Sequence, residues 1–179
     1  MRRGSLLWTF FPPLLVILIT TLVLVTGFAG RSMRGFFMER TARELENLAS
    51  LTGPRFAHQL TLGDETSVQD LCLQAGDLSE TRLTVILADG RVIGDSEQDP
   101  AVMDNHRNRP EIDHALKGEV GRSTRFSATL GHQRMYVAVP VSAPPPGEET
   151  FVVRASVSLD SLAGLMRQVY VKIALVGMI

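Results

Sequence analysis

The chain begins with an apolar stretch that runs from Leu6 to Ala29 without a charged residue. A helix needs about 20 predominantly apolar residues to cross the hydrocarbon core of a bilayer, and this stretch is long enough. Two adjacent prolines lie in its first half, where a transmembrane helix tolerates them with a kink. The pattern predicts a transmembrane helix over residues 6–30, preceded by a short cytoplasmic segment, residues 1–5.

A cleaved signal peptide is the alternative for this stretch, because two arginines precede it and Gly27 and Ala29 fit a small-x-small cleavage site. The apolar core of a signal peptide has roughly 7–15 residues, so the greater length favours an uncleaved anchor. Both alternatives export the residues that follow. Arg2 and Arg3 favour a cytoplasmic N-terminus, although four arginines soon follow the span and weaken the charge asymmetry.

A second apolar stretch, Val169–Ile179, ends the sequence and carries one charge, that of Lys172. It is too short to cross a bilayer by itself. We interpret residues 169–179 as the truncated start of a second transmembrane helix, reached through a return helix over residues 159–168. An apolar helix packed on the domain is the alternative. With two spans, the residues between them form one extracytoplasmic loop, long enough for a compact domain.

Helical spacing dominates the first part of this loop. One helix is predicted over Arg31–Leu62, where Gly53 and Pro54 are expected to kink or break it. A second is predicted over Thr66–Ala75, with Gly76 as its stop. The apolar face of the first helix recurs every three or four residues and consists of Leu45, Leu48, Ala49, Thr52 and Phe56.

The period then changes to that of β-strands. Asp89 and Gly90 divide two apolar runs within Arg82–Ser96, which is a strong signal for a hairpin. A short helix is predicted to begin at Pro110 and to end before Gly118. Three further strands are predicted over residues 121–128, 134–142 and 150–158.

Five antiparallel strands with helices packed on one side constitute an α+β domain. Its two terminal helices return to the same membrane face, a geometry that can pass a small helix displacement through the bilayer. The predicted organisation is a cytoplasmic N-terminus (1–5), a transmembrane helix (6–30), membrane-proximal helices (31–80), an α+β core (81–158), a return helix (159–168) and the start of a second span (169–179).

Composition excludes several functions. The net charge is -1 and no long basic tract occurs, so the chain lacks the electrostatic footprint of nucleic-acid binding. Its one cysteine, Cys72, can form neither an internal disulfide nor a CxxC site, and is expected to pack as a small apolar residue. His106 and His114 are spaced unlike zinc ligands, and together with His132 and Asp104 they are expected to have structural or surface roles.

Catalytic chemistry also finds little support in the sequence. Paired carboxylates need a cleft and separated pKa values to act as acid and base. The acidic residues that lie close together fall on a polar stretch, where we expect solvated side chains. There is no G-x-S-x-G nucleophile elbow, and no catalytic residue is assigned. The acidic residues concerned are Asp95, Glu97, Asp99 and Asp104.

An ordered set of short motifs carries a family resemblance: N-H-x-x-R-P-E, A-L-x-G, R-x-S-x-T-L-G and M-Y-V-A-V-P-V. They lie within Thr84–Pro100, Met103–Gly131 and Met135–Val141. This block resembles the extracytoplasmic PAS-like (Cache-type) domain of phosphate-regulon sensor histidine kinases, the PhoR group. The resemblance implies a five-stranded antiparallel PAS-like sheet over residues 81–158, in a homodimeric receptor of the bacterial cytoplasmic (inner) membrane.

The resemblance also implies a kinase region beyond Ile179, which would use ATP and Mg and pass a phosphoryl group to a response regulator. Within these residues, His58 lacks the acidic neighbour and the Thr-Pro of a phospho-acceptor box, and no Gly-rich nucleotide loop occurs. The 179 residues are therefore expected to be neither an enzyme nor a cofactor-binding chain. Input domains of chemoreceptors or diguanylate cyclases, and a non-signalling membrane-anchored binding module, are the alternatives.

PAS-like domains hold ligands between the sheet and the loop-helix segment that covers it. Arginines with a histidine suit a small anionic ligand, because the guanidinium fork pairs with a carboxylate through two hydrogen bonds. In the alternative, Asn105 and His106 cap the loop and Arg109 pairs with Glu111 or Asp113, and a membrane protein partner can also deliver the signal. The candidate ligand-binding residues are Asn105, His106, Arg107, Arg109, Arg125, Ser127 and Tyr136.

Overall fold

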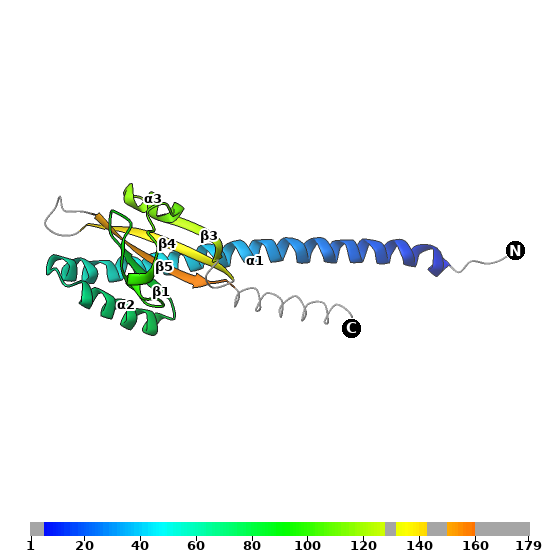
Figure 1. The fold of residues 1–179 in the computed structure, drawn as a ribbon. Helices are drawn as coiled ribbons and strands as arrows, with labels where there is room; N and C mark the ends of the chain where they lie inside the picture. Colours follow the sequence, from blue (N-terminus) through cyan, green and yellow to red (C-terminus); the bar gives the residue numbers. More distant parts are fainter. Residues whose placement is uncertain (1–5, 128–131, 143–149, 160–179) are drawn as a thin grey trace. The chain divides into compact units, whose positions relative to one another are not determined.

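The computed structural model describes residues 6–127, 132–142 and 150–159. The chain divides into two compact units, Met1–Thr41 and Ala42–Ile179. Helix α1, Leu6–Thr61, contributes residues to both units (Figure 1). The predicted return helix and the start of the second span lie outside the described residues, apart from Leu159, which is a bend.

The first unit is the apolar part of α1. Among the described residues, one helix is long and apolar enough to cross a membrane, over Phe10–Thr61, with a mean hydropathy of 2.3 in its most apolar window. None of that window is buried within the protein. Pro12 and Pro13 lie inside the helix without interrupting it, and the hydroxyl of Thr20 donates to the carbonyl of Val16 at 2.8 Å. By length and composition this helix can span a bilayer.

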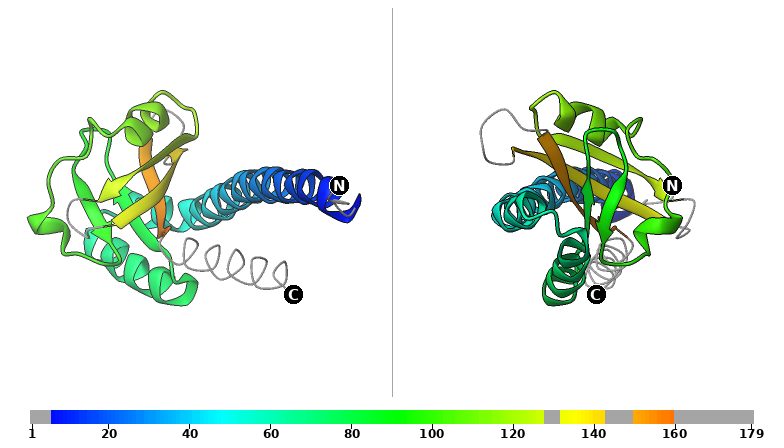
Figure 2. Two further views of the ribbon diagram at one scale, coloured as in Figure 1. Left: turned by 90° about the vertical axis from the view of Figure 1, so that its right-hand side faces the viewer. Right: turned by 60° about the vertical axis from the view of Figure 1, so that its left-hand side comes forward.

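The second unit contains a five-stranded antiparallel sheet in the order β2-β1-β5-β4-β3 (Figure 2). β5 is the central strand, since β1 and β4 pair with its two edges. The five predicted strands are confirmed, with bounds that differ by at most two residues. The strands are β1 Arg82–Ile86, β2 Val92–Asp95, β3 Gly121–Ser127, β4 His132–Ser142 and β5 Thr150–Ser158.

Helices cover both faces of this sheet, not one face as expected. The second half of α1 and α2 (Glu65–Ser79) lie against one face, and α3 (Pro110–Leu116) lies against the other (Figure 1). A 3-10 turn, η1 (Pro100–Val102), was not predicted and precedes α3. The side chains under α3 form an apolar cluster of Ile86, Val92, Ile112, Ala115, Ala138 and Val152.

The expected break at Gly53 and Pro54 is absent, because α1 continues as a helix to Thr61. Gly53 allows a close approach to the sheet: a Cβ added there would lie 2.9 Å from Cγ2 of Val141. Phe56, in the next turn of the helix, is fully buried. The burial of this face stabilises the helix and offsets the single hydrogen bond that proline removes.

Gly76 is not the stop of α2, which continues to Ser79 and ends at Glu80 in the left-handed conformation, with φ 51°. A Cβ added to Gly76 would lie 2.4 Å from Cβ of Ser96. The glycine is therefore a packing contact between α2 and the residue that follows β2. Sequence pattern does not separate this role from that of a helix stop, since both favour glycine near a helix end.

Gly76→Ala is expected to destabilise the domain by about 1–3 kcal/mol, because the added methyl overpacks the contact with Ser96. In an uncrowded helix the same change stabilises. Gly35, in α1, is the matched control, since nothing stands within 4 Å of a Cβ added there. Thermal unfolding followed by circular dichroism compares the two variants. A melting temperature of Gly76→Ala at or above that of the wild type would contradict the packing role.

Candidate functional site

The sheet face that α3 covers has an apolar half and a polar half. Alternation along β5 places Val152, Arg154 and Ser156 on this face, and Val152 lies under α3. In the register of the sheet, Arg154 stands opposite Thr84 of β1, and Ser156 stands opposite Tyr136 of β4. Polar side chains from three adjacent strands therefore meet beyond the edge of the apolar cluster.

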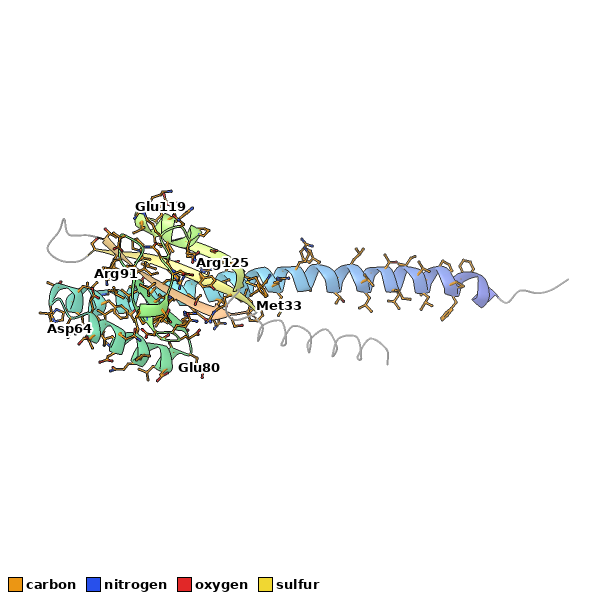
Figure 3. The ribbon with its side chains drawn as sticks, viewed as in Figure 1. Met33, Asp64, Glu80, Arg91, Glu119 and Arg125 are labelled. Carbon is orange, nitrogen blue, oxygen red and sulfur yellow. The ribbon has the colours of Figure 1, made fainter. Side chains whose placement is uncertain are left out.

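A cavity of about 400 Å³, which we call the arginine cavity, lies over this polar half. The structure brings four of the seven predicted residues to its wall, namely His106, Arg109, Arg125 and Tyr136. The position of Arg125 in the domain can be seen in Figure 3. Arg154 also lines the cavity and was missed by the sequence analysis. An arginine between the apolar residues of a buried strand was the signal that could have found it.

Two guanidinium groups dominate the cavity. Arg125 lies 4.3 Å from the centre of the Tyr136 ring, and Arg154 lies 5.2 Å from the same centre. Arg154 is 3% exposed and donates to the hydroxyl of Thr84 at 3.1 Å. Both arginines contact the Glu111 carboxylate, at 2.7 Å for Arg125 and 3.5 Å for Arg154. Such positions over an aromatic face hold guanidinium groups in place through cation–π attraction.

Several buried polar atoms at this site have no hydrogen-bond partner within the described part of the chain. They are Nε of Arg154, Nε of Arg125 and Nδ1 of His106. Burial lowers the pKa of Arg154 to about 10, so its guanidinium stays charged at neutral pH. Burial, followed by the charges of Arg154 and Arg109, lowers the pKa of His106 to about 4. A neutral imidazole beside charged guanidinium groups is an arrangement suited to an anion.

The other predicted residues do not reach this cavity. Asn105 donates from its side chain to the carbonyl of Asp89 at 2.9 Å and accepts from the backbone N–H of Arg107 at 2.9 Å. The Arg107 guanidinium donates to the carbonyl of Ala88. Both residues therefore tie the loop before α3 to the β1–β2 turn, which is the capping role that the alternative gave to Asn105. The side chain of Ser127, at the end of β3, lies outside the described residues.

The two carboxylates that the alternative gave Arg109 as partners are paired with other cations. Glu111 contacts Arg125 and Arg154, and Asp113 forms an ion pair with Lys117 at 2.7 Å. Arg109 lines the cavity, where its charge adds to those of the two guanidinium groups on the sheet.

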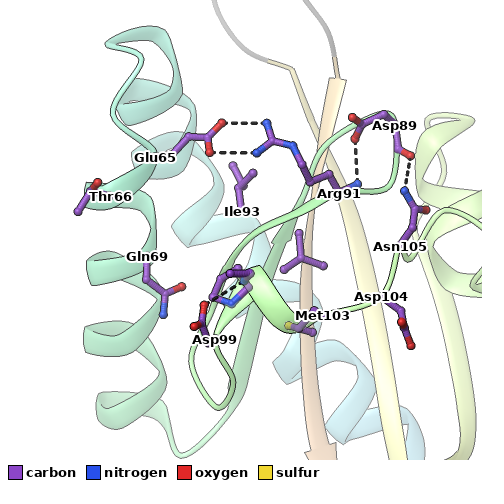
Figure 4. A pocket seen from close by; sticks show the side chains of 13 residues that line it. Glu65, Thr66, Gln69, Asp89, Arg91, Ile93, Asp99, Met103, Asp104 and Asn105 are labelled. Carbon is purple, nitrogen blue, oxygen red and sulfur yellow. Dashed lines mark hydrogen bonds and ion pairs between the residues drawn. The ribbon is translucent and has the colours of Figure 1, made fainter.

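A second cavity, of about 730 Å³, lies between α2, the β1–β2 hairpin and η1 (Figure 4). Glu65 and Arg91 point toward each other there and form two hydrogen bonds, at 2.9 and 3.1 Å. Asp89 accepts from the backbone N–H of Arg91 at 2.8 Å, and Asp99 accepts from that of Ala101 at 2.9 Å. These polar groups are already paired, so this cavity offers weaker anchoring than the arginine cavity.

Asp95 is not the solvated carboxylate that the sequence suggested. It lies in β2 and is 0% exposed. Both oxygens of its carboxylate accept from Nε of Arg82 at 3.0 Å, and one of them accepts from the hydroxyl of Thr84 at 2.8 Å. The carboxylate also accepts from the backbone N–H groups of Glu97 and Gln98, at 2.8 and 2.9 Å. The group is a structural anchor for the loop after β2, because each of its contacts lies within the domain.

Glu97 likewise has a structural contact, a two-bond ion pair with Arg134 at 2.8 Å. Across the described residues, no three histidine, cysteine or acidic side chains lie together in a way that could hold a metal ion. Cys72 is buried, and burial raises the pKa of its thiol to about 12, so it packs as an apolar side chain.

Asp95→Asn is expected to lower the free energy of unfolding by about 3 kcal/mol, since it removes the fully buried charge that pairs with Arg82 and leaves the half-exposed Glu97, at 3.4 Å, as the remaining carboxylate partner. Asp104→Asn is the control, because this carboxylate is exposed and such changes usually stay within about 0.5 kcal/mol. Thermal and urea unfolding of the two variants test the difference. Equal stabilities would show that Asp95 is no anchor.

His106 is expected to make the domain less stable in acid. Its pKa in the folded protein is about 4 and that of free histidine is about 6.5, so the unfolded chain binds the proton first as pH falls. Between pH 6.5 and 4 this effect costs on the order of 2 kcal/mol.

His106→Asn removes that contribution, so the difference in melting temperature between wild type and variant should change across this pH range. The same difference for His58→Asn, an exposed histidine of α1, should stay nearly constant. A His106→Asn profile parallel to that of the wild type would contradict the assignment of a buried neutral imidazole.

No protein-family model and no curated protein matches the chain. Solved structures do resemble it. The sensor domain of the histidine kinase DctB from V. cholerae superposes with a TM-score of 0.63 at 14% identity, covering 76% of this chain and 56% of that one. The E. coli DcuS sensor domain superposes with a TM-score of 0.58 at 14% identity, covering 72% of this chain and 96% of that one. A third structure is the ligand-binding domain of the Pseudomonas aeruginosa amino acid chemoreceptor PctC, in complex with GABA. It superposes with a TM-score of 0.55 at 18% identity, covering 74% of this chain and 62% of that one.

The chain thus spans only part of the length of the DctB and PctC structures that it resembles. At these identities the comparison shows the fold. The long N-terminal helix and the five-stranded antiparallel sheet are those of the Cache/PAS-like sensor domains, as predicted, whereas the three structures do not support the PhoR group in particular.

Proposed function

We propose that the chain is the extracytoplasmic signal-input region of a membrane-bound receptor and that it binds a small anionic ligand in the arginine cavity. The observation that carries the proposal is the pair of guanidinium groups, Arg125 and Arg154, held over Tyr136 at the wall of the cavity. Orienting them before the ligand arrives reduces the entropy that binding costs. No acid–base pair in the described site favours catalysis over binding.

The apolar half of α1 supports placement of the chain at a membrane. In the proposed receptor this helix crosses the bacterial cytoplasmic membrane with the sensor domain outside, and the chain works as a homodimer. An output region on the cytoplasmic side belongs to the proposed receptor. α1 contributes both to the apolar helix and to the sheet packing through Gly53, so a shift of the domain can be relayed along it.

For the output we propose a sensor histidine kinase of the PhoR type. Its kinase region would use ATP and Mg and would transfer a phosphoryl group to a response regulator. The family resemblance of Thr84–Val141 supports this choice. A chemoreceptor or a diguanylate cyclase is the second candidate, because the same fold occurs in the chemoreceptor PctC and in a putative sensory box/GGDEF family protein from Vibrio parahaemolyticus, with a TM-score of 0.55 for the latter. The coding sequence after Ile179 distinguishes these: an acidic residue after a histidine and an ATP-binding fold support the kinase.

The test of ligand binding uses the whole 179-residue chain in lipid nanodiscs. A carboxylate at 100 times its dissociation constant should stabilise the domain by about 2.7 kcal/mol and raise its melting temperature by several degrees. Phosphate and a panel of small carboxylates are compared. Arg125→Gln should remove most of the shift, because it takes one guanidinium from the cavity.

The control variant is Arg91→Gln, which breaks the exposed ion pair with Glu65 outside this cavity and should leave the shift intact. A wild-type chain that no anion stabilises, or an Arg125→Gln variant stabilised as much as the wild type, would overturn the anion-binding proposal. The first result would favour a signal delivered by a membrane protein partner.

A further inference from the structure

Glu111 lies behind the arginine cavity and is 0% exposed. It is in the first turn of α3, and its Oε1 contacts the guanidinium groups of Arg125 and Arg154, at 2.7 and 3.5 Å. Its Oε2 has no hydrogen-bond partner within the described part of the chain. Glu111 is not among the residues that line the cavity, so it acts on a ligand there through its charge.

The backbone at Glu111 is tightly packed. A Cβ added to Gly121 of β3 would lie 1.9 Å from the carbonyl oxygen of Glu111, so strand and helix are in direct backbone contact. Ile112 and Ala115 of the same helix are fully buried under the apolar half of the sheet. The packing of α3 therefore holds the Glu111 backbone in place, and the buried carboxylate is kept beside the two arginines by its contacts with them.

This charge lies behind a cavity wall that carries charges of both signs. Arg82, which also lines the cavity, is paired with Asp95 by contacts of 3.0 Å and adds little net charge. Three arginines of the wall, at positions 109, 125 and 154, then face the buried carboxylate of Glu111 and the exposed carboxylates of Asp99 and Asp104, which also line the cavity. Of these carboxylates, Glu111 is the one that is buried in contact with two guanidinium groups. Because burial limits screening by salt, the carboxylate acts on any anion that enters the cavity.

We propose that Glu111 is a specificity-determining residue of the cavity, whose fixed carboxylate selects singly charged organic anions over dianions. This inference rests on the proposed function of the cavity as an anion site. A fixed charge repels each carboxylate of the ligand, and the repulsion weakens with distance, so a dianion loses more binding free energy than a monoanion and at most twice as much.

The rim of the cavity supports an organic ligand over inorganic phosphate. Val102 of η1 and Phe126 of β3 both line it and are 80% and 63% exposed. Met103 and the ring of Tyr136 add further apolar surface to the wall. A carboxylate with a hydrocarbon body covers these groups while its head meets the guanidinium groups, whereas phosphate leaves them in water.

The test compares pentanoate and glutarate, which have the same carbon chain and differ by one carboxylate. Their dissociation constants are measured by calorimetry for the whole chain in nanodiscs, as wild type and as Glu111→Gln. Removing the charge should tighten pentanoate binding by about fivefold and glutarate binding by a larger factor, with about 25-fold as the upper bound for two carboxylates equally close to Glu111. Glu65→Gln, which removes a carboxylate bonded to Arg91 away from this cavity, should leave the ratio of the two affinities unchanged.

Equal factors for the two ligands, or no change in either, would overturn the inference while leaving the anion site in place. If the wild type binds neither ligand, the proposed function fails instead. Should Glu111→Gln not fold, Arg125→Gln carries the test, because it should weaken glutarate more than pentanoate. The double variant restores the net charge of the wall and should return the ratio to that of the wild type. A ratio that is the same in Arg125→Gln and in the wild type would also overturn the inference.

Discussion

Arg154 stands in the middle of the central strand with its guanidinium 3% exposed, so its charge needs partners inside the protein. Thr84 and Glu111 supply them, and Glu111 comes from α3 on the covering layer. The same requirement applies to Arg82, which Asp95 pairs. Pairing of charges on this one face therefore fixes both the helix and the loop that enclose the cavity, because a buried charge without a partner costs several kcal/mol.

This face combines two tasks that usually conflict. Its apolar half, from Ile86 to Val152, packs against α3 and stabilises the domain by excluding water. Its polar half keeps charged groups oriented beside an open volume, an arrangement that costs stability and that the proposed binding site would need. The two halves share the strands β1, β4 and β5, so the position of α3 over the apolar half also sets the geometry of the polar half.

The opposite face has a simpler role. α1 and α2 pack on it through small contacts, such as Gly53 against Val141 and Gly94 against Cys72. These contacts bring the two helices close to the sheet, so a displacement of the strands would displace α1 as well.

Much of the architecture follows from local pattern. The uncharged run from Leu6 to Ala29, the turn at Asp89-Gly90 and the Pro110 start of α3 each predict their element, because chain geometry and burial act over a few residues. The resemblance to PAS-like domains, and not this pattern, implied the candidate set that includes His106, Arg109, Arg125 and Tyr136.

The sequence by itself therefore determined the order of helices and strands, the apolar stretch that can span a bilayer and the arginine-rich nature of the candidate site. Only the tertiary structure decided that Asn105 and Arg107 hold a turn, that Asp95 is buried, and that Arg154 and Glu111 belong to the site. Whether a charge is solvated or paired depends on strands and helices brought together from distant parts of the chain. That pairing has no periodicity along the sequence from which it could be predicted.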